Sequence, residues 1–438
     1  MSFSDLALHS DLLRALELAG HTSPTPVQAA AIPVAVEGRD VLATADTGTG
    51  KTGAFLLPSL HRLMVADDAA AAATGDGRPV RPFGPRVLVL APTRELARQV
   101  TQAARTYVKF RRLFVADVLG GVPYRQQLRD LSRRNDVVVA TPGRLLDHVR
   151  RGTARLNEVE VLILDEADRM LDLGFAEDIQ AIASACPAER QTLLFTATLD
   201  RRMEGIARGL LRDPARVAVE STPASAPKIE QRLLFADDLD HKRRLLQHFA
   251  GLDEVGKAIV FAATKRDADM LAETLSADGH SAAALHGDMR QEARTRTLSR
   301  LRDGRVRLLV ATDVAARGID VRDITHVINF DLPRNPEDYV HRIGRTGRAG
   351  AEGIAISFAT RGDHGVLRGI ERLIGDAVPV HRVPGLEPSA RAESAPRAKR
   401  PGGHRAGGPP RGGRTFGPKG RDSGTRTAHA APAYGRGR

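Results

Sequence analysis

The sequence predicts an α/β protein with two tandem, doubly wound parallel-sheet domains followed by a disordered basic tail. Short runs of Val, Ile and Leu recur along the chain without polar–apolar alternation, which is typical of parallel strands covered on both faces. Helical patterns separate these runs, and strand–helix alternation favours right-handed crossovers. The C-terminal part is rich in Gly, Pro and Arg, a composition that cannot bury enough apolar surface to fold.

Two sets of strand-like runs define the two domains. The first set is 40–44, 86–92, 115–119, 136–141, 161–165 and 192–198, and the second is 257–264, 281–287, 307–313, 325–331 and 353–359. A stretch rich in Pro, Ser and Ala separates them, and the last helical pattern ends near Arg372. We therefore expect domains at 1–219 and 229–372, a linker at 220–228 and a disordered Arg/Gly-rich tail at 373–438. The low-complexity segment 66–84 is expected to be a surface loop.

The net charge of +12 is concentrated at the C-terminus. Residues 383–438 hold twelve Lys/Arg and three Asp/Glu, so they carry +9 and leave +3 for residues 1–382. With Phe416 and Tyr434 among its Arg and Gly residues, this tail favours non-specific contact with nucleic acid through charge and stacking. The alternative is a tail that only increases solubility.

The apolar runs are far shorter than the ~18 residues of a membrane span, so no membrane partner is expected. The N-terminus lacks the basic region of an export signal. One cysteine, Cys186, excludes an intramolecular disulfide and fits a reducing compartment. We therefore expect a cytoplasmic protein.

The stretch ATADTGTGKTGAF (43–55) places Gly-Lys-Thr between a strand-like run and a helical pattern. This context is that of a phosphate-binding loop, in which backbone N–H groups and a helix N-terminus hold phosphates. Lys51 is expected to reach the β- and γ-phosphates, and Thr52 to offer its hydroxyl to Mg²⁺. The general loop pattern has Gly where this chain has Ala45.

An acidic pair, Asp165 and Glu166, ends the apolar run VEVLILDE. Beside a phosphate loop, Asp165 is expected to hold Mg²⁺, partly through water, and Glu166 to accept a proton from the attacking water. The alternative is structural, because Asp165 or Asp168 could cap the helix that follows.

Two arginines lie in the Gly-rich stretch HRIGRTGR (341–348) of the second domain, which has no phosphate loop of its own. Arg345 and Arg348 are therefore expected to act as arginine fingers, which stabilise the charge that develops on a transferring phosphoryl group.

Three loops of the first domain, PTREL (92–96), Gly120-Gly121 and TPGR (141–144), follow strand-like runs. Open α/β sheets bind ligands at the carboxyl ends of their strands, so Arg94 and Arg144 are expected to contact phosphates of a nucleic-acid strand. Helix capping by the threonines of these loops is the alternative, and it is compatible with phosphate contact.

Residues 165–168 spell DEAD, and over residues 1–370 the chain resembles the DEAD-box ATP-dependent RNA helicases of superfamily 2. That family writes its phosphate loop A-x-T-G-x-G-K-T, so Ala45 is the form the family has. The resemblance implies two RecA-like domains that use ATP and Mg²⁺. It also implies RNA-stimulated ATP hydrolysis coupled to local unwinding or remodelling of RNA duplexes and RNA–protein complexes. The segment that leads into the phosphate loop and the short exit into the basic tail are similar to bacterial RhlE-type members.

The resemblance also implies roles for individual residues. Phe3 and Gln28, in a Q motif at 1–29, would recognise adenine, and Gly318 and Asp320 would approach the ribose. The implied ATP-binding residues are Phe3, Gln28, Ala45, Thr47, Gly48, Thr49, Gly50, Lys51, Thr52, Gly318 and Asp320. The implied RNA-binding residues are Pro92, Thr93, Arg94, Gly121, Thr141, Gly143, Arg144, Thr264, Gln291, Arg294 and Thr312. The residues expected to couple hydrolysis to strand separation are Asp168, Thr196, Thr198, His341 and Arg342. Thr196 stands where the family usually has Ser.

Two other functions remain open at this point. One is an ATP-driven DNA helicase or translocase of the same superfamily, and the other is a non-enzymatic RNA-binding clamp dominated by the tail. We expect RNA as the partner and a monomeric core. The sequence does not indicate which RNA is the target.

Overall fold

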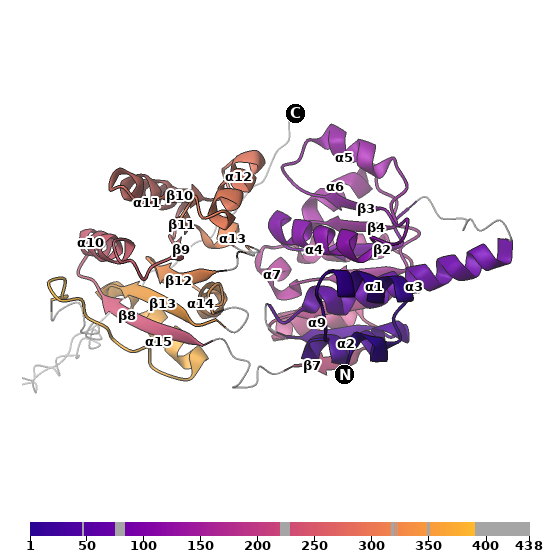
Figure 1. Cartoon of the computed structure of the whole chain (residues 1–438), viewed down its shortest axis with the longest axis horizontal. Coiled ribbons are helices and arrows are strands. Elements are labelled where there is room, and N and C mark those ends of the chain that lie inside the picture. The colour runs from indigo at the N-terminus through magenta and orange to yellow at the C-terminus, as the bar shows by residue number, and fades with distance from the viewer. Residues whose placement is uncertain are drawn as a thin grey trace, which may run out of the picture. The chain divides into compact units, whose positions relative to one another are not determined.

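The computed structural model describes residues 1–45, 48–74, 84–219, 228–316, 319, 321, 323–347 and 351–389. These residues form two parallel β-sheets, each with helices packed on it (Figure 1). The predicted fold class, two doubly wound α/β domains in tandem, is confirmed.

The first sheet has seven parallel strands in the order β3-β4-β2-β5-β6-β1-β7. The strands are β1 (Val41–Thr44), β2 (Val87–Leu90), β3 (Val115–Val118), β4 (Val137–Ala140), β5 (Val161–Leu164), β6 (Gln191–Thr196) and β7 (Ala215–Ala218). Every residue of β2, β4 and β5 is buried, because successive side chains of a strand point to opposite faces and helices cover both.

Helices form the two outer layers of the first domain. They are η1 (Phe3–Leu6), α1 (Ser10–Leu18), α2 (Pro26–Val36), α3 (Lys51–Thr74), α4 (Arg94–Tyr107), α5 (Tyr124–Leu131), α6 (Pro142–Arg150), α7 (Ala167–Asp172), α8 (Ala176–Ser184) and α9 (Arg201–Leu210). One apolar core lies between the sheet and α1 to α4, and a second lies between the sheet and α6 to α9.

The expected loop at 66–84 is wrong in its first part, because α3 continues to Thr74. This segment contains a run of alanines, and alanine has the highest intrinsic helix propensity, so the helix extends through it. Residues 75–83 lie outside the described part of the chain.

The second sheet has six parallel strands in the order β10-β11-β9-β12-β13-β8. The strands are β8 (Ile229–Phe235), β9 (Lys257–Phe261), β10 (Ala282–Leu285), β11 (Leu308–Ala311), β12 (Ile324–Asn329) and β13 (Gly353–Ala359). The helices are α10 (Leu239–Ala250), α11 (Lys265–Ala277), α12 (Gln291–Arg302), α13 (Asp313–Ala316), α14 (Pro336–Ile343), η3 (Arg361–Asp363) and α15 (His364–Ile374).

Residues 376–389 pack against the second sheet, although they fall within the predicted tail. Leu233 of β8 donates its backbone N–H to Pro379 at 2.8 Å, and its carbonyl accepts from His381 at 2.7 Å. Val383 is buried in the core of this domain. The Ser389 hydroxyl hydrogen-bonds Asp237 at 2.5 Å, so the chain is attached to the second sheet up to that residue. The rest of the predicted tail lies outside the described residues.

The strands of each sheet all run in one direction, so their carboxyl ends meet along one edge. In the first sheet this edge carries the segments that follow β1, β2, β3, β4, β5 and β6, which are those the sequence singles out for ligand binding. Among the described residues, no helix is both long and apolar enough to cross a membrane.

Candidate active site and nucleic-acid interface

The phosphate loop joins the end of β1 to the start of α3. Gly48 and Gly50 have φ angles of +87° and +92°, a conformation that favours glycine. A Cβ at Gly50 would lie 2.8 Å from both Gln28 Nε2 and Thr25 Oγ1, so a larger residue does not fit there. Lys51 is the first residue of α3, and its buried Nζ donates to the Ala45 carbonyl at 3.0 Å. The loop therefore holds its lysine folded over its own backbone.

Thr52 is half-buried in the first turn of α3, and Thr49 is half-buried in the loop itself. Thr47, which the sequence also assigns to ATP binding, lies outside the described residues.

Gln28 contacts the phosphate loop directly. Its Oε1 accepts from the Thr25 backbone N–H at 3.0 Å, and its Nε2 donates to the Gly50 carbonyl at 2.9 Å. An amide has one further N–H and one further lone pair, so this geometry leaves it able to contact a base. Phe3 is buried in the core of the first domain.

Asp165 and Glu166 follow β5 at the centre of the first sheet, and both side chains are buried. Burial raises the pKa of Asp165 to about 7, and the attraction of Lys51 opposes this rise. Among the described residues, Asp165 Oδ1 has no hydrogen-bond partner. A buried carboxylate oxygen without a donor is suited to a cation, because removing it from water is otherwise costly.

Glu166 has a left-handed backbone conformation, with φ +51° and ψ +54°, at the N-cap of α7. Such a conformation is uncommon for a residue with a side chain and is found preferentially at functional sites. Arg169, one turn further along, brings its Nε to 3.4 Å from Glu166 Oε2. Arg169 is 2% exposed, and sequence reasoning missed it.

Asp168 connects the acidic segment to the turn after β6. Its Oδ2 accepts from the backbone N–H groups of Ala197 and Thr198, at 3.1 and 3.0 Å, and from the Thr198 hydroxyl at 3.1 Å. Burial acts to raise the pKa of Asp168, but the hydrogen bonds from Thr198 and the attraction of Lys51 bring it below its usual value. The hydroxyl of buried Thr196 donates to the Thr198 carbonyl at 2.7 Å.

Arg342 is buried in the second domain. Its Nε and Nη2 donate to the two carboxylate oxygens of Asp313 at 2.6 and 2.7 Å, and its Nη1 donates to Asn329 Oδ1 at 3.1 Å. Its guanidinium lies 4.8 Å from the centre of the Phe261 ring. The sequence indicates a role for Arg342 between the domains, whereas these contacts all lie within the second one. Neither Asp313 nor Asn329 was singled out by sequence reasoning.

Arg345 is also buried, and its Nη1 donates to the Ile319 carbonyl at 3.2 Å. A small cavity is lined by residues from both halves of the chain, including Arg169, Asp313, His341 and Arg345. The candidate finger Arg345 therefore lines the same cavity as the neighbour of Glu166. Arg348, Gly318 and Asp320 lie outside the described residues.

The candidate RNA-binding segments lie at the carboxyl edges of the two sheets. Thr93 caps α4, and its Oγ1 accepts from Leu96 at 3.2 Å. Thr264 caps α11 in the same way. Thr141 Oγ1 accepts from the Gly120 N–H at 3.3 Å, which joins two of the loops. Capping therefore occurs at these threonines alongside any ligand contact.

The remaining members of the predicted RNA-binding set lie in the same loops. Pro92 is buried next to Thr93, Gly143 is exposed in the first turn of α6, and Thr312 is buried just before α13. The backbone of Gly121 lies directly against the Arg94 guanidinium, because a Cβ there would be 2.3 Å from Nη1. Arg144 donates to the Val122 carbonyl at 2.9 Å.

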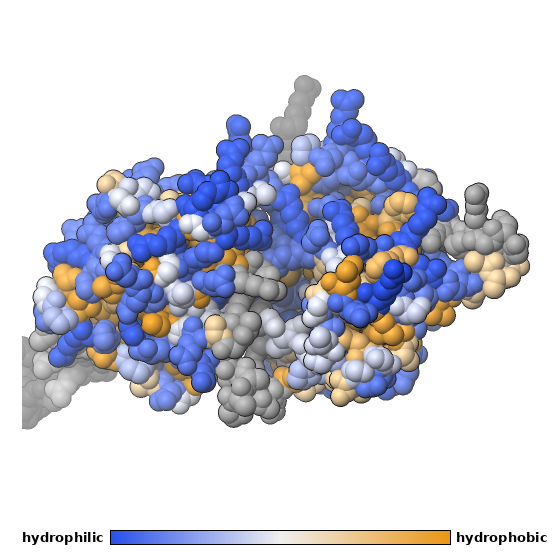
Figure 2. All heavy atoms as spheres, in the orientation of Figure 1, coloured by the Kyte–Doolittle hydropathy of each residue, from blue (hydrophilic) through white to orange (hydrophobic). Residues whose placement is uncertain are grey.

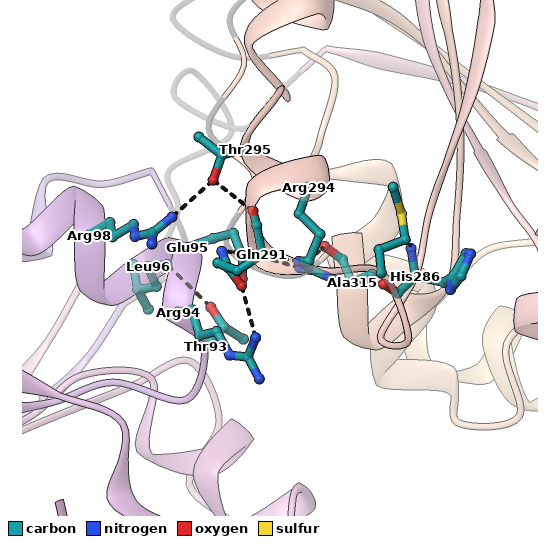
Figure 3. Close-up of polar contacts among 11 residues, drawn as sticks. Thr93, Arg94, Glu95, Leu96, Arg98, His286, Gln291, Arg294, Thr295 and Ala315 are labelled. Carbon is teal, nitrogen blue, oxygen red and sulfur yellow. Dashed lines mark hydrogen bonds and ion pairs between the residues drawn. The ribbon is translucent and has the colours of Figure 1, made fainter. Parts of the chain in front are cut away.

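Three of the predicted RNA-binding residues lie in a network between α4 and α12 (Figure 3). Arg94 Nη1 donates to Gln291 Oε1 at 2.8 Å. Arg294 donates to Glu95 Oε1 from Nη2 at 2.8 Å and from Nε at 3.0 Å. Arg98 Nη1 donates to the Thr295 hydroxyl at 3.0 Å. Glu95 was missed from the sequence, although its position inside PTREL beside Arg94 was a signal for it.

A nucleotide loop facing a buried acidic pair, in the first of two tandem parallel sheets, defines the class of two-domain nucleoside triphosphatases that includes the helicases. The family model described as DEAD/DEAH box helicase matches residues 25–206. The model described as helicase conserved C-terminal domain matches residues 241–350.

Individual relatives agree over both halves. The ATP-dependent RNA helicase SrmB of Escherichia coli is 45% identical over 394 residues, which are 90% of this chain and 86% of the relative. The DEAD-box ATP-dependent RNA helicase CshA of Geobacillus kaustophilus is 42% identical over 373 residues, 85% of this chain and 76% of the relative. The structure of S. cerevisiae Dbp5 bound to RNA and ADP BeF3 is 31% identical and superposes with a TM-score of 0.76, over 87% of this chain and 95% of that one.

The chain therefore belongs to the DEAD-box ATP-dependent RNA helicase family, as the sequence resemblance implies. It is an enzyme of the RNA helicase class. The closer likeness to RhlE-type members stays a prediction.

Proposed function

We propose that this protein hydrolyses ATP when RNA is bound and uses the cycle to unwind or remodel short RNA duplexes and RNA–protein complexes. The main support is the arrangement at the carboxyl edge of the first sheet, where Lys51 of the phosphate loop lies close enough to the buried Asp165 to oppose the rise of its pKa. Phosphoryl transfer needs a cation at the phosphates and an acidic group for the metal in the same place.

In this proposal Glu166 orients the attacking water and accepts its proton. Its left-handed backbone and its contact with Arg169 fix the carboxylate before ATP binds, so less reorganisation is needed during the reaction. Lys51 leaves the Ala45 carbonyl for the β- and γ-phosphates, where the charge is greater.

Mg²⁺ fits the donors at this site. Asp165 and the Thr52 hydroxyl would hold it, partly through water, and when bound it would neutralise charge on the phosphates. Among the described residues, no group of three or more His, Cys, Asp or Glu side chains could hold a metal. This agrees with an ion that takes most of its ligands from phosphates and water.

The second domain would supply Arg345 and Arg348 as fingers for the transition state. Arg345 is buried with its guanidinium on a backbone carbonyl, so it would have to change rotamer to reach a phosphate. Phe3 and Gln28 would recognise adenine, and Gly318 and Asp320 would approach the ribose.

RNA would lie across the loops that contain Thr93, Arg94, Gly121, Thr141 and Arg144, and across Thr264, Gln291, Arg294 and Thr312 of the second domain. Contacts of this kind go to phosphate and sugar and give no sequence preference. Asp168, Thr196 and Thr198 would transmit the state of the nucleotide site to the RNA site, since Asp168 bonds to the turn after β6. The cytoplasmic location and the monomeric core stay predictions.

ATP turnover by the full chain, measured with RNA, with DNA of the same sequence and without nucleic acid, tests the proposal. We expect turnover to rise with RNA and to rise little or not at all with DNA. Stimulation by DNA alone would favour a DNA translocase, and RNA binding without any turnover would favour a non-enzymatic clamp.

A further inference from the structure

A concentration of positive charge lies beside β3, at the edge of the first sheet. Residues 105–134 contain eight Lys/Arg and two Asp, a net charge of +6, although residues 1–382 together carry only +3. Hydrophilic side chains dominate the surface over α5 in Figure 2. This local excess has no role in the site described above.

Three of these cations form one face of α5 and its C-terminal extension. Arg125, Arg129 and Arg133 are spaced four residues apart, so they lie above one another along the helix, and all three are exposed. The opposite face is buried through Gln127, whose Nε2 donates to the Leu119 carbonyl at 2.6 Å. We call Arg125, Arg129 and Arg133 the α5 stripe.

The charge of the α5 stripe is not neutralised by neighbouring acids. The structure records no ion pair for its three arginines within the described part of the chain, whereas Arg151 on α6 pairs with Asp147 at 2.8 Å. The two acids of the segment, Asp117 and Asp130, are half-buried and leave a positive excess. The stripe is therefore available to an anion.

The α5 stripe is continuous with the candidate RNA path. Gly121 lies against Arg94, and Arg144 donates to the carbonyl of Val122, only two residues before α5 begins. The ring of Tyr124, the first residue of α5, stacks on His148 of α6 with centroids 4.4 Å apart, which fixes the two helices together. The arginines thus extend outward from the loops proposed to hold the single strand.

We propose that the α5 stripe is a second RNA site, which binds the phosphate backbone of a duplex flanking the single-stranded segment in the main site. The proposal rests on the proposed function. With a rise of about 1.5 Å per residue, the three guanidinium groups follow a line roughly 12 Å long, suited to successive phosphates of one strand. The stripe has no apolar side chain of the kind that anchors protein interfaces, which favours a nucleic acid over a protein.

Binding to two RNAs that share one single-stranded sequence tests this inference. One RNA is the single strand alone, and the other carries a flanking duplex; affinities of the full chain are measured over a range of salt concentrations. For Arg125→Gln/Arg129→Gln/Arg133→Gln we expect affinity for the duplex-bearing RNA to fall on the order of tenfold, with a salt slope smaller by about 3. Affinity for the single strand, and the ATP turnover it stimulates, should not change.

Two controls make the result decisive. Arg39→Gln/Arg208→Gln/Arg216→Gln removes the same charge from exposed positions near β1 and β7, at the other edge of the sheet, and should leave both affinities near those of the unmodified chain. Substituting Lys at the three stripe positions should restore most of the duplex affinity, because phosphate contact needs charge and not a particular base-reading geometry.

Equal losses for both RNAs, equal losses in the control variant, or no loss at all would each overturn the inference. In the last case the stripe would be left for an acidic protein. Failure of the proposed function is distinct, because the unmodified chain would then show no RNA-stimulated ATP turnover.

Discussion

Arg294 donates two hydrogen bonds to one carboxylate oxygen of Glu95, from Nε at 3.0 Å and Nη2 at 2.8 Å, across 199 positions of sequence. Both side chains are buried. Arg94, next to Glu95, contacts Gln291 from the same helix as Arg294 (Figure 3). The residues proposed to hold RNA therefore also connect α4 of the first domain to α12 of the second. We expect RNA binding and contact between the two domains to favour each other.

A double-mutant cycle tests that connection. Glu95→Gln and Arg294→Gln should each lower RNA-stimulated ATP turnover, because each leaves a buried charged partner without its counter-charge. The double variant should lose less than the sum, with a coupling of about 1.5 kcal/mol or more, as found for close charge pairs. The exposed pair Glu204 and Arg208 is the control, and its coupling should be under about 1 kcal/mol. Strict additivity at Glu95 and Arg294 would show that the contact does not affect turnover.

Arg169 should position the catalytic carboxylate. Arg169→Met removes the buried guanidinium 3.4 Å from Glu166 while keeping similar volume, so kcat should fall about tenfold or more with little change in the KM for ATP. Arg169→Lys should recover part of the loss, since it restores the charge. A matching rise in KM, or a Lys variant no better than Met, would indicate a structural role instead.

The turn after β6 should tolerate serine at Thr196 and not alanine. Thr196→Ser keeps the hydroxyl that donates to Thr198, so duplex unwinding per ATP should stay near that of the unmodified chain. Thr196→Ala removes a buried hydrogen bond worth about 1 kcal/mol and should lower unwinding more than ATP turnover. Unwinding that falls equally in both variants would point to the methyl group rather than to the hydroxyl.

His148 should make stability depend on pH. Burial, followed by the charge of Arg144, lowers its pKa below 6.5 in the folded state, so the neutral ring is stabilised by folding. That contribution is present above pH 6.5 and is lost as pH falls through the lowered folded value. The unfolding free energy of His148→Gln, measured by denaturant titration, should therefore vary less with pH below 6.5. Burial also lowers the pKa of His61 and His326, so some dependence should remain.

The sequence was sufficient for features that depend on local pattern. Apolar runs gave the strands, and Gly-Lys-Thr between a strand and a helix gave the phosphate loop, because both reflect contacts between near neighbours. The pairing of Glu95 with Arg294 could not be read in this way, since nothing in local spacing joins positions 199 apart. Arg169 and Asp313 were missed for a similar reason: an arginine or aspartate on a helix is ordinarily exposed, and only packing shows that these take part in buried ion pairs.

ATP turnover and RNA binding by Glu166→Gln, measured side by side with the unmodified chain, test the central claim most directly. If Glu166 accepts the proton from the attacking water, turnover with saturating RNA should fall by about 10²-fold or more, as expected for loss of a general base. RNA affinity in the presence of ATP should persist, because the amide preserves the shape of the site. Turnover that persists in this variant would contradict the catalytic role of Glu166 and the mechanism built on it.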